Sequence, residues 1–254
     1  MRRWLDWLDK RGGEYELLVV DDASDDGTAD RVQAIAHPRL RVLRHDAPKG
    51  EGAALRTGLA ALAQPLLFYT LLRPEYPPEP LGAMLEKQVP LHDEAKTMAR
   101  EIDHVHLVSG YRAGVPVPAA LRLLGTLWRG FCWLVVGTMP ERLPGWLGWK
   151  RHLGWVWLRL VFGLRYPDAM CPYRLLRREM LPRLPIQSDS AFAHAELLAK
   201  ANFLGHILAA EQARLDAVPL DRGDGAAIRR DALRVQNAPD FGPAALPEQG
   251  SGAA

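Results

Sequence analysis

The stretch YELLVVDDASDDGT, residues 15–28, decides the fold of this chain. Leu17 to Val20 is a short apolar run rich in valine and leucine, typical of a strand buried on both faces of a parallel sheet. Asp21 and Asp22 follow directly, and the segment SDDG then supplies turn and helix-start residues. Because ligands of open α/β sheets bind at the carboxyl ends of strands, the stretch predicts a ligand site here. A surface turn with a helix N-cap is the alternative interpretation.

The same loop matches part of a calcium-binding pattern. Oxygen-bearing side chains recur at alternate positions from Asp22 to Asp30. The twelfth position is Gln33 rather than a bidentate glutamate, and the loop follows a strand rather than a helix. We therefore favour a strand-end site over an EF-hand.

Composition limits the class of protein. The chain has 254 residues with 48% hydrophobic content, enough for one sizeable domain. The net charge of +2 gives no indication of a nucleic-acid partner. The cysteines, Cys132 and Cys171, cannot form a disulfide framework, which favours a reducing compartment. No run of 18 or more uncharged apolar residues occurs, so we expect no regular transmembrane span.

Strands and helices alternate over the first half of the chain. Further strands are predicted at 40–43, 65–70 and 105–111, with helices at 3–11, 29–36 and 81–89 and another after the glycine-rich segment 46–52. This alternation predicts βαβ units and a mostly parallel sheet. Gly50 and Gly52 precede a helix, an arrangement that favours an anion at the helix N-terminus.

Tryptophan and arginine are concentrated in residues 121–163. Two apolar helices, about 121–138 and 150–163, flank a hinge at 140–148 that is rich in proline and glycine. Both residue types suit a membrane interface, where amphipathic rings and long cationic side chains are stabilised. We therefore predict that this segment lies on a membrane surface. A helical hairpin packed on the domain or at a dimer contact is the alternative.

The C-terminal third carries a basic run and a sparse tail. Arg174, Arg177 and Arg178 could clamp a phosphate by bidentate contacts, or could line a solvated helix face. His194 and Glu196 lie two residues apart on a predicted helix and do not share a face, so we expect no metal pair. Residues 221–254 are rich in glycine, alanine and proline, which predicts a flexible tail.

Six motifs together resemble the family 2 glycosyltransferases, and most closely polyprenyl-phosphate sugar synthases of the dolichol-phosphate mannosyltransferase kind. In order they are VVDDASDDGT, KGEGAALRTGL, YPPE, VSGYR, DAMCPYRLLRR and FAHAELLAKANFLG. The resemblance implies a GT-A fold for residues 1–220: an α/β, Rossmann-like, mostly parallel sheet with flanking helices, and 121–163 as an amphipathic insertion. It also implies a nucleotide-sugar donor, a divalent metal (Mg²⁺ or Mn²⁺) and inverting transfer to a polyprenyl phosphate.

The resemblance also implies roles for individual residues. The nucleotide-binding set is Asp21, Asp22, Ser24, Lys49, Gly52 and Arg56, with Asp22 on the base. The acceptor-phosphate set is Arg112, Arg174 and Arg177. The catalytic set is Arg112 and Asp168, to which we add Arg73 as a hypothesis because it stands where the family has its metal motif.

The departures from the family pattern lie at its metal and nucleotide motifs. The family begins with a strand ending in a Pro-x-Tyr-Asn-Glu-like motif, and this chain starts after it, so we expect an N-terminally truncated domain. The Asp-x-Asp metal positions read Leu71, Leu72 and Arg73, which offer no oxygen ligand from a side chain. Glu75 is the only nearby carboxylate and a weak metal candidate. A guanidinium at Arg73 could instead neutralise the leaving phosphate.

These expectations define a peripheral enzyme on the cytoplasmic, inner face of the plasma membrane. Its partners would be a nucleotide-sugar, a lipid phosphate and the membrane surface, with no nucleic acid. An acceptor phosphate is already ionised, so the reaction requires no general base. The alternative is a catalytically inactive relative that binds a membrane or a protein.

Overall fold

We obtained the fold from a computed structural model, which describes residues 1–86, 106–112, 119–136, 156–164, 166, 168–205, 208–211 and 224–243. Helices and strands alternate through residue 110, as predicted. The N-terminal elements are α1 (Arg2–Arg11), β1 (Leu17–Asp21), α2 (Thr28–Gln33), β2 (Leu40–Arg44), α3 (Glu51–Ala61), β3 (Leu66–Thr70), α4 (Glu79–Glu86) and β4 (Leu107–Gly110). The later ones are α5 (Ala119–Val136), β5 (Tyr173–Arg177), the 3₁₀ helix η2 (Arg178–Arg183), α7 (Phe192–Phe203), β6 (Leu208–Glu211) and α8 (Gly225–Asn237).

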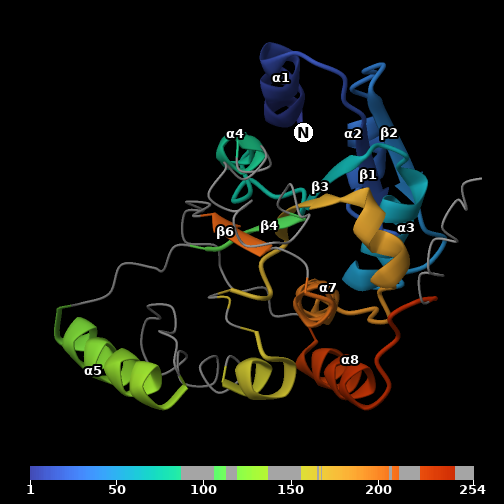
Figure 1. The fold of residues 1–254 in the computed structure, drawn as a ribbon. Helices are drawn as coiled ribbons and strands as arrows, with labels where there is room; N and C mark the ends of the chain where they lie inside the picture. The colour runs from blue at the N-terminus through green and yellow to red at the C-terminus, as the bar shows by residue number, and fades with distance from the viewer. Residues whose placement is uncertain are drawn as a thin grey trace, which may run out of the picture.

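The described strands form two separate sheets (Figure 1). β1 and β2 pair in parallel, with Leu17 opposite Leu40 and Asp21 opposite Arg44. The second sheet has the order β3-β5-β4-β6, in which β4 and β6 are parallel and β5 runs antiparallel to both neighbours. The predicted α/β class with parallel pairing and flanking helices is confirmed, and β5 makes the second sheet mixed.

Helices cover both faces of the second sheet. Successive residues of β5 point to opposite faces, so Leu176 joins one hydrophobic cluster and Leu175 the other. The first cluster includes the buried residues of α7 and α8, among them Leu197 and Val235. The second includes Trp4 of α1 together with two residues of α4. A strand that is apolar on both faces therefore forms the centre of the fold.

Two predictions about the C-terminal third are wrong. The basic run contains a central strand, β5, rather than a solvated helix face, because its side chains are buried alternately on two faces. Residues 225–237 of the predicted flexible tail form α8, which packs against α7 and buries Ala232 and Val235. The N-cap of α8 is Asp224, whose side chain accepts a hydrogen bond from the amide of Ala226.

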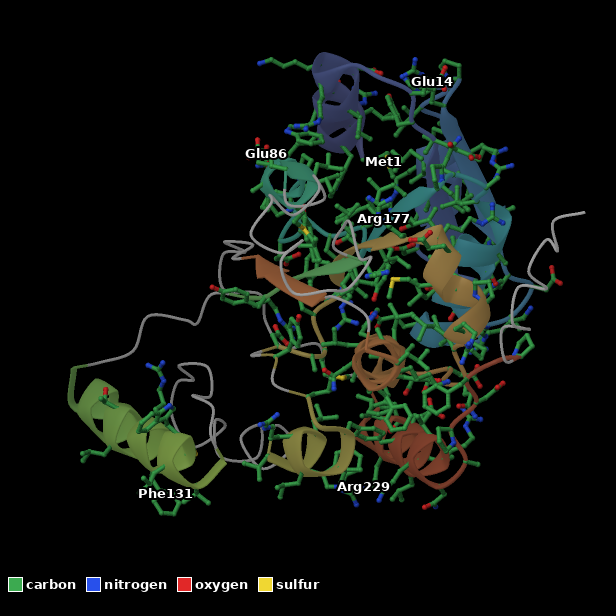
Figure 2. The ribbon with its side chains drawn as sticks, viewed as in Figure 1. Met1, Glu14, Glu86, Phe131, Arg177 and Arg229 are labelled. Atoms are coloured by element: carbon green, nitrogen blue, oxygen red, sulfur yellow. The ribbon has the colours of Figure 1, made fainter. Side chains whose placement is uncertain are left out.

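The tryptophan-rich segment is partly helical, as predicted. α5 spans most of the first predicted helix, and residues 156–162 are helical within the second. α5 stands apart from both sheets, and Phe131 projects from its exposed side (Figure 2). Trp157, by contrast, packs against the first hydrophobic cluster and contacts Phe162 edge to face. The predicted hinge at 140–148 lies outside the described residues.

Candidate functional site

The carboxyl ends of β1 and β2 meet at an acidic loop. Asp21 is buried, and its Oδ2 lies 3.2 Å from Nε of Arg44 and accepts a hydrogen bond from the amide of Ser24. Arg44 is the ladder partner of Asp21, so parallel pairing brings the two side chains together. A second arginine bond, from Nη2 of Arg44 to the carbonyl oxygen of Ser24, closes the loop. Asp21 and Ser24 thus fix the shape of the strand end.

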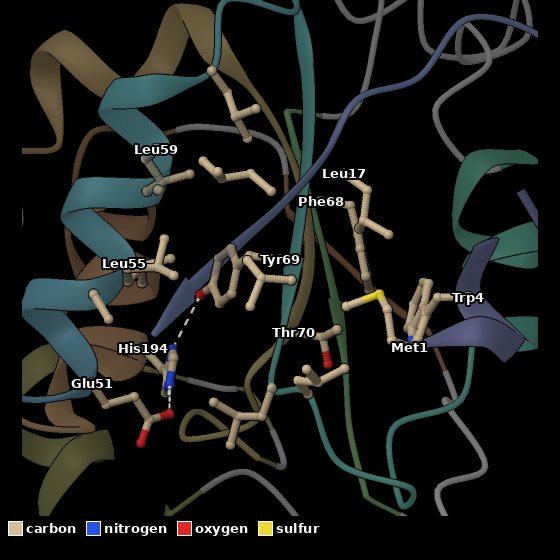
Figure 3. A pocket seen from close by; sticks show the side chains of 18 residues that line it. Met1, Trp4, Leu17, Glu51, Leu55, Leu59, Phe68, Tyr69, Thr70 and His194 are labelled. Carbon is tan, nitrogen blue, oxygen red and sulfur yellow. Dashed lines mark hydrogen bonds and ion pairs between the residues drawn. The ribbon is translucent and has the colours of Figure 1, made fainter. Parts of the chain in front are cut away.

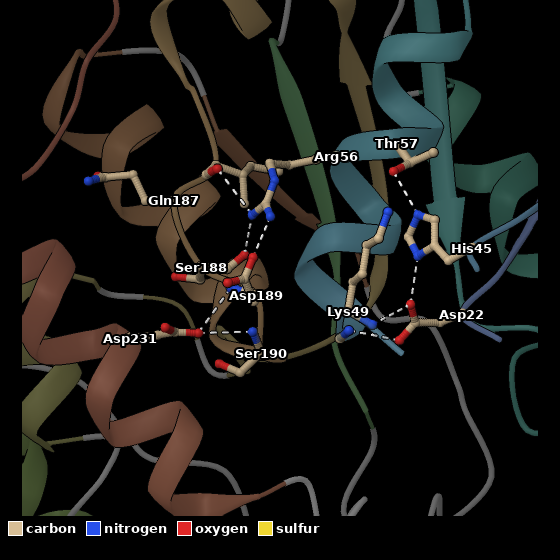
Figure 4. Close-up of polar contacts among 12 residues, drawn as sticks. Asp22, His45, Lys49, Arg56, Thr57, Gln187, Ser188, Asp189, Ser190 and Asp231 are labelled. Carbon is tan, nitrogen blue, oxygen red and sulfur yellow. Dashed lines mark hydrogen bonds and ion pairs between the residues drawn. The ribbon is translucent and has the colours of Figure 1, made fainter. Parts of the chain in front are cut away.

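Asp22 ties this loop to the glycine-rich segment (Figure 4). Its Oδ1 lies 2.6 Å from Nδ1 of His45 and accepts a hydrogen bond from the amide of Lys49, and its Oδ2 accepts one from the amide of Gly50. His45 contacts Oγ1 of Thr57 on α3 through its other ring nitrogen. Burial alone would raise the pKa of Asp22, but these hydrogen bonds outweigh it and lower that pKa.

The two glycines of the predicted anion loop, Gly50 and Gly52, allow another loop of the protein to pack closely against their backbone. A Cβ at Gly52 would lie 2.2 Å from the carbonyl oxygen of Ser188, and one at Gly50 would lie 2.3 Å from that of Asp189. Gly50 also has φ of 99°, a conformation that favours glycine. The amide of Gly52 donates to the carbonyl oxygen of Asp189. One amide at the N-terminus of α3 is therefore already occupied by protein.

Side chains from three helices hold this second loop, residues 186–190. Nη1 of Arg56 on α3 donates to the carbonyl oxygens of Ile186 and Ser188, and its Nη2 pairs with Asp189. Glu196 of α7 accepts hydrogen bonds from the amides of Gln187 and Ser188. Asp231 of α8 accepts hydrogen bonds from the amides of Asp189 and Ser190 (Figure 4). Arg56, predicted to bind nucleotide, positions a loop in this structure.

Glu51, His194 and Tyr69 form a polar cluster at one end of a cavity (Figure 3). Nε2 of His194 lies 2.6 Å from Oε1 of Glu51, and its Nδ1 lies 3.4 Å from the hydroxyl of Tyr69. Burial lowers the pKa of His194 and raises that of Tyr69 to about 12. We assign a neutral imidazole to His194. Its Nε2–H donates a hydrogen bond to the Glu51 carboxylate, and its Nδ1 accepts a hydrogen bond from the hydroxyl of Tyr69.

Arg112 and Asp168 form a buried, bidentate ion pair. Nε of Arg112 lies 2.5 Å from Oδ2 of Asp168, and Nη2 lies 2.7 Å from Oδ1. Burial would lower the pKa of Arg112, but the hydrogen bonds and charge of Asp168 raise it. Asp168 therefore fixes the position of the Arg112 guanidinium. Burial would raise the pKa of Glu51, but the hydrogen bond from His194 and the nearby positive charges of Arg73 and Arg112 lower it.

The predicted phosphate clamp by Arg174 and Arg177 is wrong. Arg174 is fully buried, and its guanidinium pairs with the carbonyl oxygens of Ala169 and His194. Arg177 lies three residues along the same strand and so points to the opposite face. It is opposite Leu66, at the far end of β3 from Thr70. The two arginines do not converge on one anion.

The side chains after β3 do not fit a divalent cation. Leu71 packs against the second hydrophobic cluster, and neither Leu72 nor Arg73 offers an oxygen ligand. Oε2 of Glu75 is buried without a hydrogen-bond partner, a single candidate donor. Within the residues that the structure describes, no group of three or more histidine, cysteine, aspartate or glutamate side chains could hold a metal ion.

Sequence reasoning missed several residues that organise the site: His45, Glu51 and the loop residues Ser188 and Asp189. His45 follows β2 just as Asp22 follows β1, and the ends of parallel strands meet, so its contact with Asp22 could have been anticipated. The 186–190 loop carried no such signal, because its contacts with α3 join residues more than a hundred positions apart.

Comparisons with known proteins find a similar fold and one partial family match. A model described as "Glycosyl transferase family 2" matches residues 2–70. A crystal structure of glucosyl-3-phosphoglycerate synthase from Mycobacterium tuberculosis in complex with UDP is similar, with a TM-score of 0.52 and 21% identity over 93% of this chain and 75% of that one. The same enzyme with Mn²⁺, UDP-glucose and phosphoglyceric acid gives a TM-score of 0.52 and 19% identity, over 93% and 74% of the two chains.

A third structure, titled only as a mycobacterial protein, has a TM-score of 0.53 and 19% identity, over 94% of this chain and 69% of that one. None of the curated proteins compared with the chain matches it. The family model covers residues 2–70 of the 254, and the solved structures, which are below 25% identity, share the fold. None of the helices in the described part of the chain is long and apolar enough to cross a membrane.

Proposed function

We propose that this protein transfers a sugar from a nucleotide-sugar donor to an acceptor phosphate. The observation that supports it most is the placement of positive charge beside the strand ends. Arg112, held by Asp168, follows β4, and Arg73 follows β3; both strands run antiparallel to β5, so the two arginines follow strand ends at the same edge of the sheet. The donor diphosphate would lie between these arginines and the loop held by Asp22.

The chemistry requires charge stabilisation more than proton transfer. The bond between the anomeric carbon and the diphosphate oxygen breaks, and its electron pair remains on the diphosphate, which gains negative charge. An acceptor phosphate oxygen forms the new bond to the anomeric carbon, and this oxygen is already ionised. Arg73 and Arg112 would stabilise the leaving diphosphate as fixed cations in place of a metal. Because the residues after β3 do not fit a divalent cation, we assign no step to one.

A lipid-linked phosphate is the acceptor that we propose. α5 carries exposed apolar side chains, namely Leu127, Phe131, Trp133, Leu134 and Val135. Four of them, at 127, 131, 134 and 135, follow helical spacing and form one stripe. Such a stripe beside Arg129 suits the surface of a bilayer that contains a polyprenyl phosphate. The similar M. tuberculosis enzyme was crystallised with phosphoglyceric acid, so small phosphorylated acids form the competing acceptor class.

A transfer assay tests this proposal. The protein is incubated with UDP-, GDP- and dTDP-sugars and one of three acceptors: polyprenyl phosphate in vesicles, 3-phosphoglycerate or glycerol 3-phosphate. Mass spectrometry should detect a sugar-phosphate lipid in the first case. A product with a small acid alone would replace the lipid acceptor while keeping the transferase. No product with any pair of substrates, and no nucleotide binding by calorimetry, would contradict transfer altogether.

The second candidate is a catalytically inactive relative that binds a membrane or a protein. It is favoured by the residues after β3, which offer Glu75 as a single candidate metal ligand. Binding of vesicles without binding of any nucleotide-sugar would select this candidate.

A further inference from the structure

Glu51 and His194 connect the two parts of the candidate site. Glu51 is the first residue of α3 and directly follows Gly50, whose amide donates to Asp22 at the end of β1. His194 lies on α7 and contacts Tyr69, the last residue but one of β3. The pair therefore lies between the loop held by Asp22 and the end of β3, where the proposed function places the donor diphosphate.

The pair carries one negative charge in the free protein, because the Glu51 carboxylate is ionised and the imidazole of His194 is neutral. The charged groups near it come from several elements: Arg73 from the segment after β3, Arg112 with its partner Asp168 from the segments after β4 and before β5, and Arg174 from β5. Tyr69 stays neutral, because burial raises its pKa to about 12. A diphosphate would add negative charge beside Glu51, which favours the uptake of a proton there.

The hydrogen bonds of His194 suit both of its protonation states (Figure 3). Its Nε2 lies 2.6 Å from Oε1 of Glu51, and its Nδ1 lies 3.4 Å from the hydroxyl of Tyr69. A hydroxyl both donates and accepts, so the Tyr69 oxygen could accept a hydrogen bond from a protonated Nδ1. The imidazolium would thus keep a partner at each ring nitrogen. The side chain of His194 is 3% exposed and that of Glu51 is 27% exposed, so a ligand approaches from the Glu51 side.

We propose that Glu51 and His194 together take up one proton from solvent when a nucleotide diphosphate binds. The proton goes to Nδ1 of His194, and the pair becomes neutral overall. The diphosphate then meets an ion pair instead of a lone carboxylate, which offsets the repulsion from Glu51. The proton returns to solvent when the nucleoside diphosphate leaves. This inference rests on the proposed function, because it requires a diphosphate at this site.

The uptake of a proton makes nucleotide affinity depend on pH. A ligand that raises the proton affinity of a group is itself bound more tightly when that group is protonated. Where the free pair is unprotonated and the bound pair is protonated, nucleotide affinity should fall by up to about tenfold for each pH unit of increase. Above the pKa of the bound pair neither state holds the proton, and below the pKa of the free pair both states hold it. The dependence therefore vanishes at both extremes.

Isothermal titration measures the proton directly. UDP-glucose, GDP-mannose and dTDP-glucose are each titrated in buffers of different ionisation enthalpy, and the slope of the observed heat against that enthalpy gives the number of protons taken up. Nucleotide-sugars are used because a terminal phosphate itself titrates near about pH 6. The preferred donor should take up roughly half a proton or more at about pH 7. Its affinity should fall at least about threefold from about pH 6 to 8, where histidines titrate.

The variants identify the group that accepts the proton. His194→Gln removes the titratable ring and should abolish both the uptake and the pH dependence. Glu51→Gln removes the carboxylate that stabilises the imidazolium, and it should also abolish the uptake. His37→Gln is the matched control: His37 also pairs with a carboxylate, 3.2 Å from Asp9, but it precedes β2 and so lies at the opposite end of the strands from Asp22. Its uptake should equal that of the wild type, with all folds checked by circular dichroism.

The outcomes separate this inference from the proposed function. Binding of a nucleotide-sugar by the wild type without proton uptake, or uptake that persists in His194→Gln, would overturn the inference and leave sugar transfer standing. No binding of any of the three nucleotide-sugars would overturn both.

Discussion

Arg112 and Asp168 are joined by two hydrogen bonds, of 2.5 and 2.7 Å, between side chains that are 11% and 2% exposed. The pair links the end of β4 to the turn before β5 across 56 positions of sequence. It fixes the orientation of a guanidinium beside the candidate nucleotide site, so that a cation is in place before any substrate arrives.

Replacement of Asp168 should therefore lower the free energy of unfolding substantially. Asp168→Ala leaves the buried guanidinium of Arg112 without its partner, and breaking such a pair costs about 3–5 kcal/mol. The free energy of unfolding in urea measures the loss. Glu79→Ala is the matched control, because it breaks the surface pair with Arg3, whose side chains are 63% and 53% exposed, and such pairs contribute about 0–1 kcal/mol. Equal losses in the two variants would contradict a structural role for the buried pair.

Two glycines on α3 should respond differently to the same added methyl group. A Cβ at Gly52 meets the carbonyl oxygen of Ser188 at 2.2 Å, whereas the nearest atom to one at Gly58 is a methyl carbon of Val20 at 3.4 Å. We expect Gly52→Ala to displace the 186–190 loop and destabilise the protein by about 2 kcal/mol or more. Gly58→Ala should be neutral or stabilise by up to about 1 kcal/mol through helix propensity. The melting temperatures of the two variants test this difference. Similar values would argue against the close contact between Gly52 and Ser188.

The stability of the protein should fall as the pH drops below about 6.5. Burial lowers the pKa of His194 below that of a free histidine, so the folded state binds this proton less readily than the unfolded state does. The contribution of neutral His194 to stability is complete above the pKa that this histidine has in the unfolded state. It is lost as the pH falls toward the lower pKa that His194 has in the folded state. Unfolding free energies across this range should rise with pH in the wild type, with a smaller slope in His194→Gln. A wild-type profile that is flat, or that rises toward acid, would show that the imidazolium is the stabilised form.

The sequence predicted the strands of the first half and missed those parts whose patterns are ambiguous. β1, β2 and β3 begin within one residue of their predicted starts, because short apolar runs between turn residues specify strands well. β5 was missed because Arg174 and Arg177 read as exposed, although one is buried by bonds to carbonyl oxygens. α8 was missed because alanine and glycine give little periodicity, and tertiary contacts stabilise it.

The candidate site was predictable only in part. Asp22 was singled out at a strand end, where ligands of open α/β sheets bind, and Arg112 was singled out by the resemblance to family 2 glycosyltransferases. The pairing of Glu51 with His194 joins positions 143 residues apart, and no local pattern encodes it. No local pattern encodes the contact of Gly52 with Ser188 either. The close contacts of Gly50 and Gly52 give these glycines a packing role, whereas the sequence suggested a phosphate-binding loop.

The stripe on α5 should bind anionic bilayers. Phe131 and Leu134 of the stripe are 55% and 76% exposed, and the neighbouring Trp133 is 56% exposed; the combined replacement of all three by serine should abolish flotation with phosphatidylglycerol vesicles. Binding of the wild type should weaken with salt, since part of it is electrostatic. Leu233→Ser on α8, which removes another exposed leucine, should float like the wild type. Unchanged flotation of the triple variant would place the contact elsewhere and remove the main support for a lipid acceptor.

We propose that cationic side chains, rather than a metal ion, neutralise the charge of the nucleotide diphosphate. Isothermal titration of the protein with UDP, GDP and dTDP, each with EDTA or with Mn²⁺, tests it most directly. Affinity for the preferred nucleotide should be the same in both conditions. Arg73→Ala should lower it about tenfold or more, as expected for a charge-assisted hydrogen bond, and Arg3→Ala on the exposed face of α1 should not. Loss of binding in EDTA together with an unchanged affinity of Arg73→Ala would contradict the account.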